Sequence, residues 1–477
     1  MPKPTPYVPH PDYDTLEYTS QYHSVHPCYL DKDKSVSIPD IYAYDGVVQG
    51  QPKPLTGSHS LLGLREDICF DRFGRYGPYG LGYPSDEGGL QIGLDTENST
   101  SDGVWEKTGK INYDNIDWGD VQDRCFESNK KRFHGPDGQT DATSWLFPKR
   151  QKISRTAVVV RAYTDYPWSY HGILNIRALI SELALRSGGE YHVHFLLHVR
   201  NNTEPIWGDN ATVQRILVEN VPEEFHSLCT LWSEAQMRLI YPGDFSRSFS
   251  NPSNLDIFGV YRSAHLPLQH FAVNHPEYDF FWNWELDIRY IGNYYELFER
   301  LGEWAKNQSR VEIWERSAKY YIPAYHGDWA NFTSLVHNET IASGRTPIIG
   351  PVDFPGREPL TPNSKTSPSP PPAPPPTSPY PPQTPPRQPI TPPPSLLRLP
   401  RATPHPPRRS AIITASRLSR RLLAAMHEEV LRLQHTTFSE MFPATVALHH
   451  GLKAVYAPHP VGNGSSYAMG KEGGMAA

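Results

Sequence analysis

The sequence has few cysteines and no long apolar runs. Only four of its 477 residues are cysteine, Cys28, Cys69, Cys125 and Cys229, which is too few for a small disulfide-stapled domain but leaves room for two disulfides. The apolar runs, such as TAVVV and FLLHV, are far shorter than the roughly 18 uncharged residues that a spanning helix needs. The first residues lack the basic and apolar regions of a signal peptide. We therefore expect neither a transmembrane segment nor a targeting signal in this chain.

Basic residues are also fewer than acidic residues in this chain. The chain has 45 Lys and Arg against 51 Asp and Glu, and its basic residues are scattered apart from arginine-rich patches near 407–421. Because no broad basic surface is available to neutralise phosphates, we do not expect nucleic acid as a partner. Several catalytic motifs are missing from the sequence: the G-x-S-x-G elbow, the phosphate-binding P-loop, H-E-x-x-H and paired C-x-x-C.

Two features that are present point to the secretory pathway. One is the even number of cysteines, and the other is a set of seven N-x-Ser/Thr sequons. The sequons are at Asn98, Asn201, Asn210, Asn307, Asn331, Asn338 and Asn463. We expect a location in the secretory pathway or the lumen of the Golgi.

Changes in composition divide the chain into five segments. Residues 1–150 are rich in Pro, Gly, Tyr and Asp with little periodicity, which predicts an irregular segment packed on a core. Residues 151–355 alternate strand and helix patterns and form the expected α/β core, which 409–462 completes. Between them, the Pro-rich tract 356–408 cannot bury apolar area, so we expect it to be disordered and polyproline II-like. The tail 463–477 is expected to be disordered as well.

The core pattern predicts an α/β fold with a mostly parallel sheet and helices on both faces. Apolar runs rich in β-branched and aromatic residues predict strands at 155–163, 191–200, 278–290, 410–416 and 451–461. Helical spacing of apolar residues predicts helices at 169–185, 255–274 with a bend or break at Pro267, 293–305 and 417–434.

The strand YDFFWNWELDIRY, residues 278–290, ends in two acids, Glu285 and Asp287. Ligands of open parallel sheets gather at the carboxyl ends of strands, and we interpret this strand as the third of the series. Two carboxylates close together suit Mg²⁺ or Mn²⁺, which leaves its other positions to water and diphosphate oxygens. The alternative is that both acids only end the strand and cap the next turn, with Arg289 as a salt partner.

The sequence also resembles a large fungal family known as domain of unknown function 3405. The phrases that carry the resemblance are CFDRFGRYGPYG, WNWELDIRYIGNYYELF, SRLSRRLLAAMHEE and FSEMFPATVALHHGLKAVYAPHPV. The family pattern is in turn similar to metal-dependent glycosyltransferases of the GT-A type, which is an analogy at the level of the fold. The resemblance implies that Glu285 and Asp287 hold the metal and that Arg161 and Tyr163 face the nucleotide.

This chain departs from the family pattern in two places. Family members have a continuous ordered stretch where this chain has its Pro-rich tract, and they usually have an amino-terminal anchor. A mis-spliced gene model accounts for both departures, and the protein would then be inactive or unstable.

Four more residues are candidates for the site. His459 follows a predicted strand and is a candidate for a further ligand of the metal ion. The alternative is that His459 is only a turn residue before Pro460. Glu440 is the candidate general base, and the alternative is that it is a surface residue or a residue in the first turn of a helix. Asp328 and Trp329 are candidates to bind an acceptor sugar. The alternative is that they belong to an ordinary loop with no binding role.

The sequence therefore predicts a divalent-metal glycosyltransferase that moves a sugar from a nucleotide-sugar to a glycan or protein acceptor. A glycoside hydrolase that uses Glu285 and Asp287 as acid and base is one alternative. A non-catalytic protein whose PxxP-rich tract recruits SH3 or WW-type domains is another. The donor sugar, the acceptor, the stereochemical outcome and the oligomeric state stay open.

Overall fold

The computed structural model describes residues 3–47, 49–50, 53–94, 102–105, 109–134, 150–245, 256–352, 357–361 and 406–460. Its centre is a five-stranded sheet with the order β6-β5-β4-β7-β8, in which all pairs are parallel except the pair of β7 and β8. The strands are β4 (Thr156–Tyr163), β5 (Tyr191–His198), β6 (Cys229–Trp232), β7 (Phe280–Glu285) and β8 (Ala415–Ser419). The expected α/β class with a mostly parallel sheet is confirmed.

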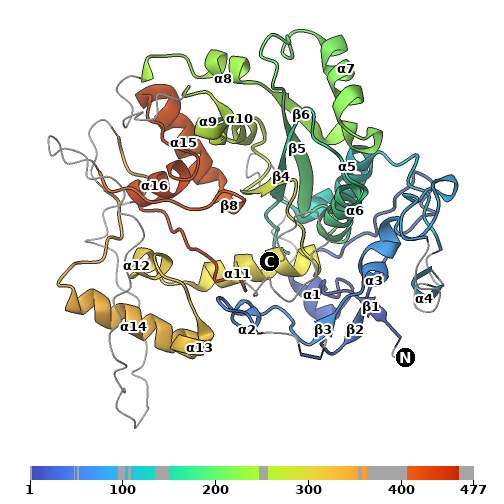
Figure 1. The fold of residues 1–477 in the computed structure, drawn as a ribbon, viewed down its shortest axis with the longest axis horizontal. Coiled ribbons are helices and arrows are strands. Elements are labelled where there is room, and N and C mark those ends of the chain that lie inside the picture. Colours follow the sequence, from blue (N-terminus) through green and yellow to red (C-terminus); the bar gives the residue numbers. More distant parts are fainter. Residues whose placement is uncertain are drawn as a thin grey trace.

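Helices cover both faces of this sheet (Figure 1). Val158, Val160 and the tryptophans of β7 pack on one face against α5 (Trp118–Asn129), α6 (Tyr170–Leu179) and α11 (Tyr294–Asn307). Ala157, Val159 and Phe281 pack on the other face against α8 (Glu234–Ile240), α10 (His265–Asn274), α15 (Arg420–Leu433) and α16 (Phe442–His449). Because successive side chains of a strand point to opposite faces, the strands buried on both faces read as nearly continuous apolar runs.

Several predicted elements differ in position from those observed. The acids lie at the end of the sheet's fourth strand along the chain and not of its third, because the short strand β6, which has only four residues, intervenes. The strand predicted at 410–416 is β8 at Ala415–Ser419, and the strand predicted at 451–461 is irregular through residue 460. The helix predicted at 169–185 continues from α6 into a π-helical stretch, Ile180–Leu185.

The predicted break at Pro267 is also wrong. The break falls at Ala264, between α9 (Val260–Ser263) and α10, and Pro267 lies in the first turn of α10. A proline is tolerated there because the amide groups of the first turn have no partner within the helix.

The first part of the chain forms small elements that pack on the core. Phe73, Tyr79 and Trp118 belong to the same core cluster as Val158. These elements are β1 (Thr5–Tyr7), α1 (Leu16–Gln21), β2 (Ile41–Asp45), α2 (His59–Leu62), β3 (Ile68–Cys69), α3 (Arg72–Tyr76) and α4 (Asp102–Trp105). The remaining helices are α7 (Asn210–Asn220), α12 (Ile313–Ser317), α13 (Pro323–His326) and α14 (Trp329–Ala342).

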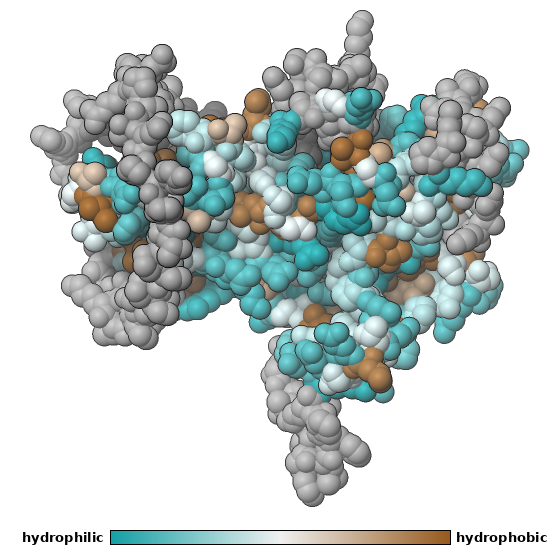
Figure 2. Space-filling view, turned by 90° about the horizontal axis from the view of Figure 1, so that it is seen from below, coloured by the Kyte–Doolittle hydropathy of each residue, from teal (hydrophilic) through white to brown (hydrophobic). Residues whose placement is uncertain are grey.

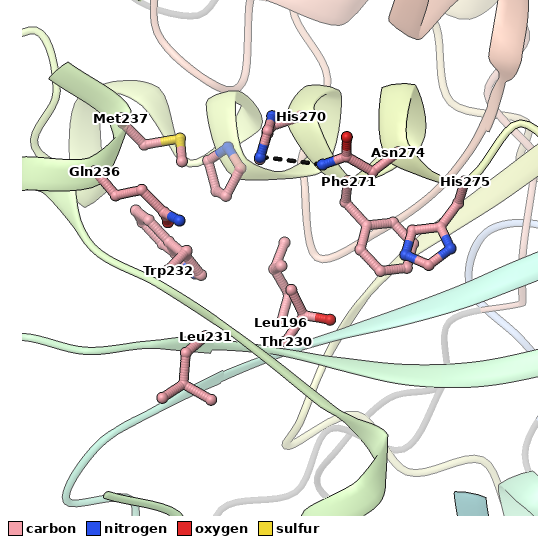
Figure 3. Close-up of a pocket in the computed structure, with 11 residues that line it drawn as sticks. Leu196, Thr230, Leu231, Trp232, Gln236, Met237, His270, Phe271, Asn274 and His275 are labelled. Carbon is pink, nitrogen blue, oxygen red and sulfur yellow. Dashed lines mark hydrogen bonds between the residues drawn. The ribbon is translucent and has the colours of Figure 1, made fainter. Parts of the chain in front are cut away.

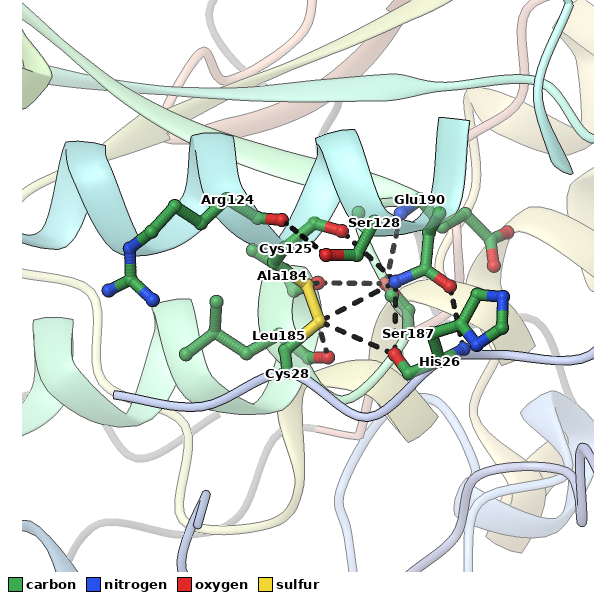
Figure 4. Close-up of a disulfide and its surroundings, with 12 residues drawn as sticks. His26, Cys28, Arg124, Cys125, Ser128, Ala184, Leu185, Ser187 and Glu190 are labelled. Atoms are coloured by element: carbon green, nitrogen blue, oxygen red, sulfur yellow. Dashed lines mark hydrogen bonds between the residues drawn. A yellow bond between two sulfur atoms is a disulfide. The ribbon is translucent and has the colours of Figure 1, made fainter. Parts of the chain in front are cut away.

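One disulfide joins the first part of the chain to the core. Cys28 is bonded to Cys125 of α5, and the bond lies between α5 and the end of the helix that includes Leu185 (Figure 4). Of the two disulfides that four cysteines allow, the structure forms this one, and Cys69 and Cys229 are free thiols.

The face seen in Figure 2 is largely hydrophilic, with small, separate apolar patches. Among the residues that the structure describes, no helix is long and apolar enough to cross a membrane. Most of the Pro-rich tract and the whole tail 463–477 lie outside the described residues, as do the sequons at Asn98 and Asn463.

Candidate functional site

The carboxyl ends of β4 and β7 bring two candidate residues together. The parallel register sets Arg161 directly beside Glu285, and their side chains form an ion pair. The guanidinium of Arg161 also donates to the carbonyl of Ile413, 3.3 Å away. Both side chains are half-buried, since 20% of Arg161 and 34% of Glu285 is exposed. The pair is therefore fixed to the sheet but open to ligand and water.

The strand pattern explains why this pair faces the α10 and α15 side of the sheet. Phe281 belongs to the core cluster on that side, and Asn283 and Glu285 follow it at steps of two residues. The side-chain amide of Asn283 donates to the carbonyl of Ile413 at 2.9 Å, and the amide of Glu285 donates to the carbonyl of Thr414 at 3.1 Å. The segment before β8 thus holds the end of β7 in place.

Asp287 and Tyr163 lie at the same edge of the sheet. Asp287 is exposed, in the turn two residues beyond β7. Burial raises the pKa of Tyr166, and the negative charge of Asp287 adds to this, which places the carboxylate near that ring. Tyr166 contacts Tyr163 edge-on at 5.4 Å between ring centres, and the guanidinium carbon of Arg200 lies 4.4 Å from the centre of the Tyr163 ring.

Glu440 is connected to this edge through the backbone. It lies in the loop between α15 and α16, and its side chain is exposed. Its carbonyl accepts a hydrogen bond of 2.7 Å from the amide of Ala411, two residues before Ile413. The loop that carries Glu440 is therefore tied to the segment that binds Arg161 and Asn283.

The other three candidates lie elsewhere. Asp328 caps α14 by accepting a 2.8 Å hydrogen bond from the amide of Asn331. Trp329 packs with Trp304 and the apolar residues of the segment that ends near His459. His459 is exposed, and its ring nitrogen Nδ1 lies 3.2 Å from the carbonyl of Ala457. Within the described ranges, none of the three is hydrogen-bonded or ion-paired with Glu285 or Asp287.

Glu285 and Asp287 offer the donor atoms that Mg²⁺ and Mn²⁺ prefer. Both supply carboxylate oxygens at one edge of the sheet, and such ions take only one or two protein carboxylates when a substrate phosphate supplies the rest. Among the described residues, no group of three or more His, Cys, Asp or Glu side chains is placed to hold a metal by itself. The residues present fit an ion that is shared with a phosphate ligand.

Two hollows in the described structure are not lined by Arg161 or Glu285. The first, about 70 Å³ in volume, lies between Trp232 of β6 and Phe271 of α10, with the hydrogen-bonded pair His270 and Asn274 at its rim (Figure 3). It is smaller than the roughly 300 Å³ of typical ligand pockets. The second, about 530 Å³, includes Asp117 and Asp120, but Asp117 caps α5 and Asp120 pairs with Arg124.

The sequence did not single out Tyr166 and Arg200, although Tyr166 closely follows one predicted strand and Arg200 ends another. The end of a strand was a usable signal, since it is the position that identified Glu285, whereas Tyr163 was implied by the family resemblance. Arg262, a buried arginine of α9, was missed for a different reason: nothing in its neighbours distinguishes it from a surface arginine.

Comparison with known proteins gives one match. The family model described as "Protein of unknown function (DUF3405)" matches residues 69–381 and 397–470, which is well over half of the chain. The chain belongs to this family. The match to DUF3405 includes Arg161, Glu285 and Glu440, and it omits residues 382–396 inside the Pro-rich tract. No curated protein and no solved structure matches the chain.

Proposed function

We propose that this DUF3405 protein is a glycosyltransferase with a GT-A-like core, which uses a divalent metal to transfer a sugar from a nucleotide-sugar to a glycan or protein. The observation that supports this most directly is the convergence of Arg161, Tyr163, Glu285 and Asp287 at the carboxyl edge of the sheet.

The strand order supports the choice of this edge. The chain passes from β4 to β5 to β6 in one direction and then returns to place β7 on the other side of β4. In open α/β sheets, ligands bind at the carboxyl ends of the strands where the order reverses in this way. Here that point lies between β4 and β7, the two strands that carry Arg161 and Glu285.

Each side chain has a role in the proposed reaction. A divalent ion held by Glu285 and Asp287 would neutralise the charge on the departing diphosphate. Arg161 holds the carboxylate of Glu285 in a fixed orientation at the strand end. The ring of Tyr163 offers a flat apolar surface for a nucleotide base. Glu440 has an exposed carboxylate that can accept the proton of the acceptor hydroxyl.

A secretory or Golgi location is part of the same proposal. The disulfide between Cys28 and Cys125 supports it, because disulfides persist in oxidising compartments and are rare in the cytosol. Nucleotide-sugar transfer to secreted glycans or proteins takes place in such a compartment, so the proposed reaction and location agree.

A thermal-shift titration tests this function. The purified chain is titrated with Mn²⁺ and a panel of UDP- and GDP-sugars, and a ligand that binds only the folded state raises the melting temperature. We expect a metal-dependent shift that Glu285→Gln and Asp287→Asn abolish and that Glu303→Gln, an exposed acid on α11, leaves intact. A normal melt of the unmodified protein with no shift for any nucleotide-sugar would contradict the transferase and favour a non-catalytic protein.

A further inference from the structure

Arg262 is a buried arginine without an acceptor for its charge. Only 1% of the residue is exposed, and within the described part of the chain none of its three side-chain nitrogens has a hydrogen-bond partner. Its guanidinium carbon lies 4.5 Å from the centre of the Phe438 ring. Two other buried arginines are paired: Arg75 with Glu182, and Arg177 with Glu224.

Such an arrangement is costly unless something else binds the charge. Taking a guanidinium out of water requires hydrogen-bond acceptors or a counter-ion, and removing a buried charge that lacks them stabilises a protein. The Phe438 ring supplies a cation–π contact but no hydrogen-bond acceptor in the plane of the guanidinium. An unsatisfied buried group of this kind points to a binding role.

Arg262 lies at the end of the sheet where the candidate site is. Helix α10 begins three residues after Arg262 and ends at Asn274, shortly before β7 begins, so the start of α10 is at the carboxyl ends of the strands. Phe438 is two residues before Glu440 in the loop that follows α15. Arg262 therefore contacts the same loop as the candidate base.

A second positive charge is close to the first. Burial lowers the pKa of Arg262 to about 10, and the positive charge of Arg408 adds to that effect. His265, the nearest titratable side chain of α10, is kept neutral because burial lowers its pKa to about 3, with Arg262 adding to the effect. Arg262 has no carboxylate partner among the described residues, so its surroundings favour an anion that comes from outside the chain.

We propose that Arg262, with Arg408 near it, forms a binding site for a phosphate-class anion. The planar fork of a guanidinium matches the geometry of phosphate oxygens and can bind two of them at once. If the anion is the diphosphate of a nucleotide-sugar, which rests on the proposed function, the site binds the leaving group on the side of the sheet that carries Glu285. Free phosphate or pyrophosphate has the same chemistry and is the other source.

The stability of two matched variants is the first test. Arg262→Met removes an unpaired buried charge and nearly conserves volume, so we expect the ligand-free protein to melt a few degrees higher. Arg75→Met removes a buried charge that is paired, leaves Glu182 without its partner and should lower the melting temperature. A lower melting temperature for Arg262→Met, or its failure to fold, would overturn the proposal, because the guanidinium would then serve the fold itself.

Calorimetric binding of pyrophosphate, without metal, is the second test. We expect Arg262→Met to bind about 10- to 100-fold more weakly than the unmodified protein, as expected for the loss of charged hydrogen bonds. Arg262→Lys should keep part of the affinity, and Arg238→Met, which changes an exposed arginine on α8, should keep all of it. Equal binding by the Arg262→Met variant, or no binding by the unmodified protein, would overturn the site.

The source of the anion follows from a comparison of ligands. Tighter binding of UDP or GDP than of pyrophosphate would identify a nucleotide diphosphate, and equal binding would identify the free anion. If pyrophosphate binding depends on Arg262 but no nucleotide-sugar raises the melting temperature with Mn²⁺, the anion site is supported and the transferase proposal is contradicted. If a nucleotide-sugar and pyrophosphate each bind the unmodified protein and Arg262→Met equally well, the transferase is supported and the Arg262 site is contradicted.

Discussion

Glu182 is a fully buried carboxylate that connects three parts of the chain. Its oxygens accept hydrogen bonds of 2.6 Å from Arg75, 3.0 Å from the hydroxyl of Tyr79 and 2.8 Å from the amide of Tyr294. Arg75 and Tyr79 belong to the first part of the chain, Glu182 to the core helix and Tyr294 to α11. This one residue thus holds the irregular segment onto the sheet domain.

We expect Glu182→Gln to lower the free energy of unfolding by about 3 kcal/mol, because the substitution leaves the Arg75 guanidinium buried without a counter-ion. Urea unfolding monitored by circular dichroism measures the loss. Glu303→Gln, an exposed change on α11, serves as the control and should stay within about 0.5 kcal/mol of the unmodified protein. A loss below about 1 kcal/mol for Glu182→Gln would mean that the buried pair adds little to stability.

At the scale of elements, the disulfide fixes the first part of the chain to α5. Cys28 and Cys125 are 97 residues apart, and Asn129 supports the bond from the same helix. The Asn129 amide donates to the carbonyls of His26 and Cys125, each at 3.0 Å, and its oxygen accepts from the amide of His26 at 2.8 Å. A covalent link and a hydrogen-bonded clamp therefore act at the same place.

Replacing both bonded cysteines, as Cys28→Ser with Cys125→Ser, should cost about 4 kcal/mol of stability, because a cross-link over a loop this long restricts the unfolded chain strongly. Chemical denaturation with and without a reducing agent measures this loss. The reducing agent should lower the stability of the unmodified protein but not that of the double variant. Cys69→Ser, which changes a half-buried free thiol, is the matched control. Equal stability of the double variant and the unmodified protein would contradict the assigned pairing.

The core strands were predictable because their signals are local. Runs of β-branched and aromatic residues identified β4, β5 and β7, and the position at the end of the β7 pattern identified the acids. The place of β8 was not predictable, because its antiparallel pairing with β7 selects Ala415–Ser419 rather than the more β-branched residues before it. The apolar stretch 451–460 stays irregular and packs Val455 and Ala457 onto the cluster around Trp304. Arg262 could not be found, since burial of an arginine depends on packing between distant elements.

At the scale of the whole molecule, buried histidines make the fold sensitive to acid. Burial lowers the pKa of His192 to about 3, and the charges of Arg155 and His275 add to the effect. In the unfolded chain a histidine titrates near 6.5, so between pH 6.5 and 3 the unfolded state binds more protons. The contribution of His192 to stability is complete above pH 6.5 and is lost as the pH falls. Glu190, whose pKa burial and Glu299 raise to about 8, acts in the opposite direction.

The variant His192→Gln separates the effect of His192 on the pH dependence of stability from that of Glu190. Between pH 7 and 5 the unmodified protein should lose about 2 kcal/mol more stability than His192→Gln, which cannot titrate there. Urea midpoints at pH 7, 6 and 5 give the comparison. His134→Gln changes an exposed histidine and should leave the pH dependence unchanged. The same pH dependence for His192→Gln and the unmodified protein would show that His192 does not cause the acid sensitivity.

The two described flanks of the Pro-rich tract attach to neighbouring residues of the core. On one side, the hydroxyl of Thr361 donates to the carbonyl of His450 at 2.7 Å. On the other, the ring nitrogen Nε2 of His449 lies 2.8 Å from the carbonyl of Pro407. The flanks thus leave and rejoin the core at one place, close to Glu429, which accepts from Arg357 at 3.0 Å and lies 2.7 Å from His450. The family match also omits residues within this tract.

Because the flanks meet, we expect the described core to fold without the residues between them. Replacing 364–404 by a Gly/Ser linker of about eight residues, which spans up to about 25 Å, should change the melting temperature by no more than about 2 °C. Removing one flank anchor as well, by Arg357→Met, should lower the melting temperature because it leaves Glu429 buried with one cation fewer. Unfolding of the linker variant would mean that the replaced residues belong to the core. Retained folding together with lost nucleotide-sugar binding would instead assign them to the ligand site.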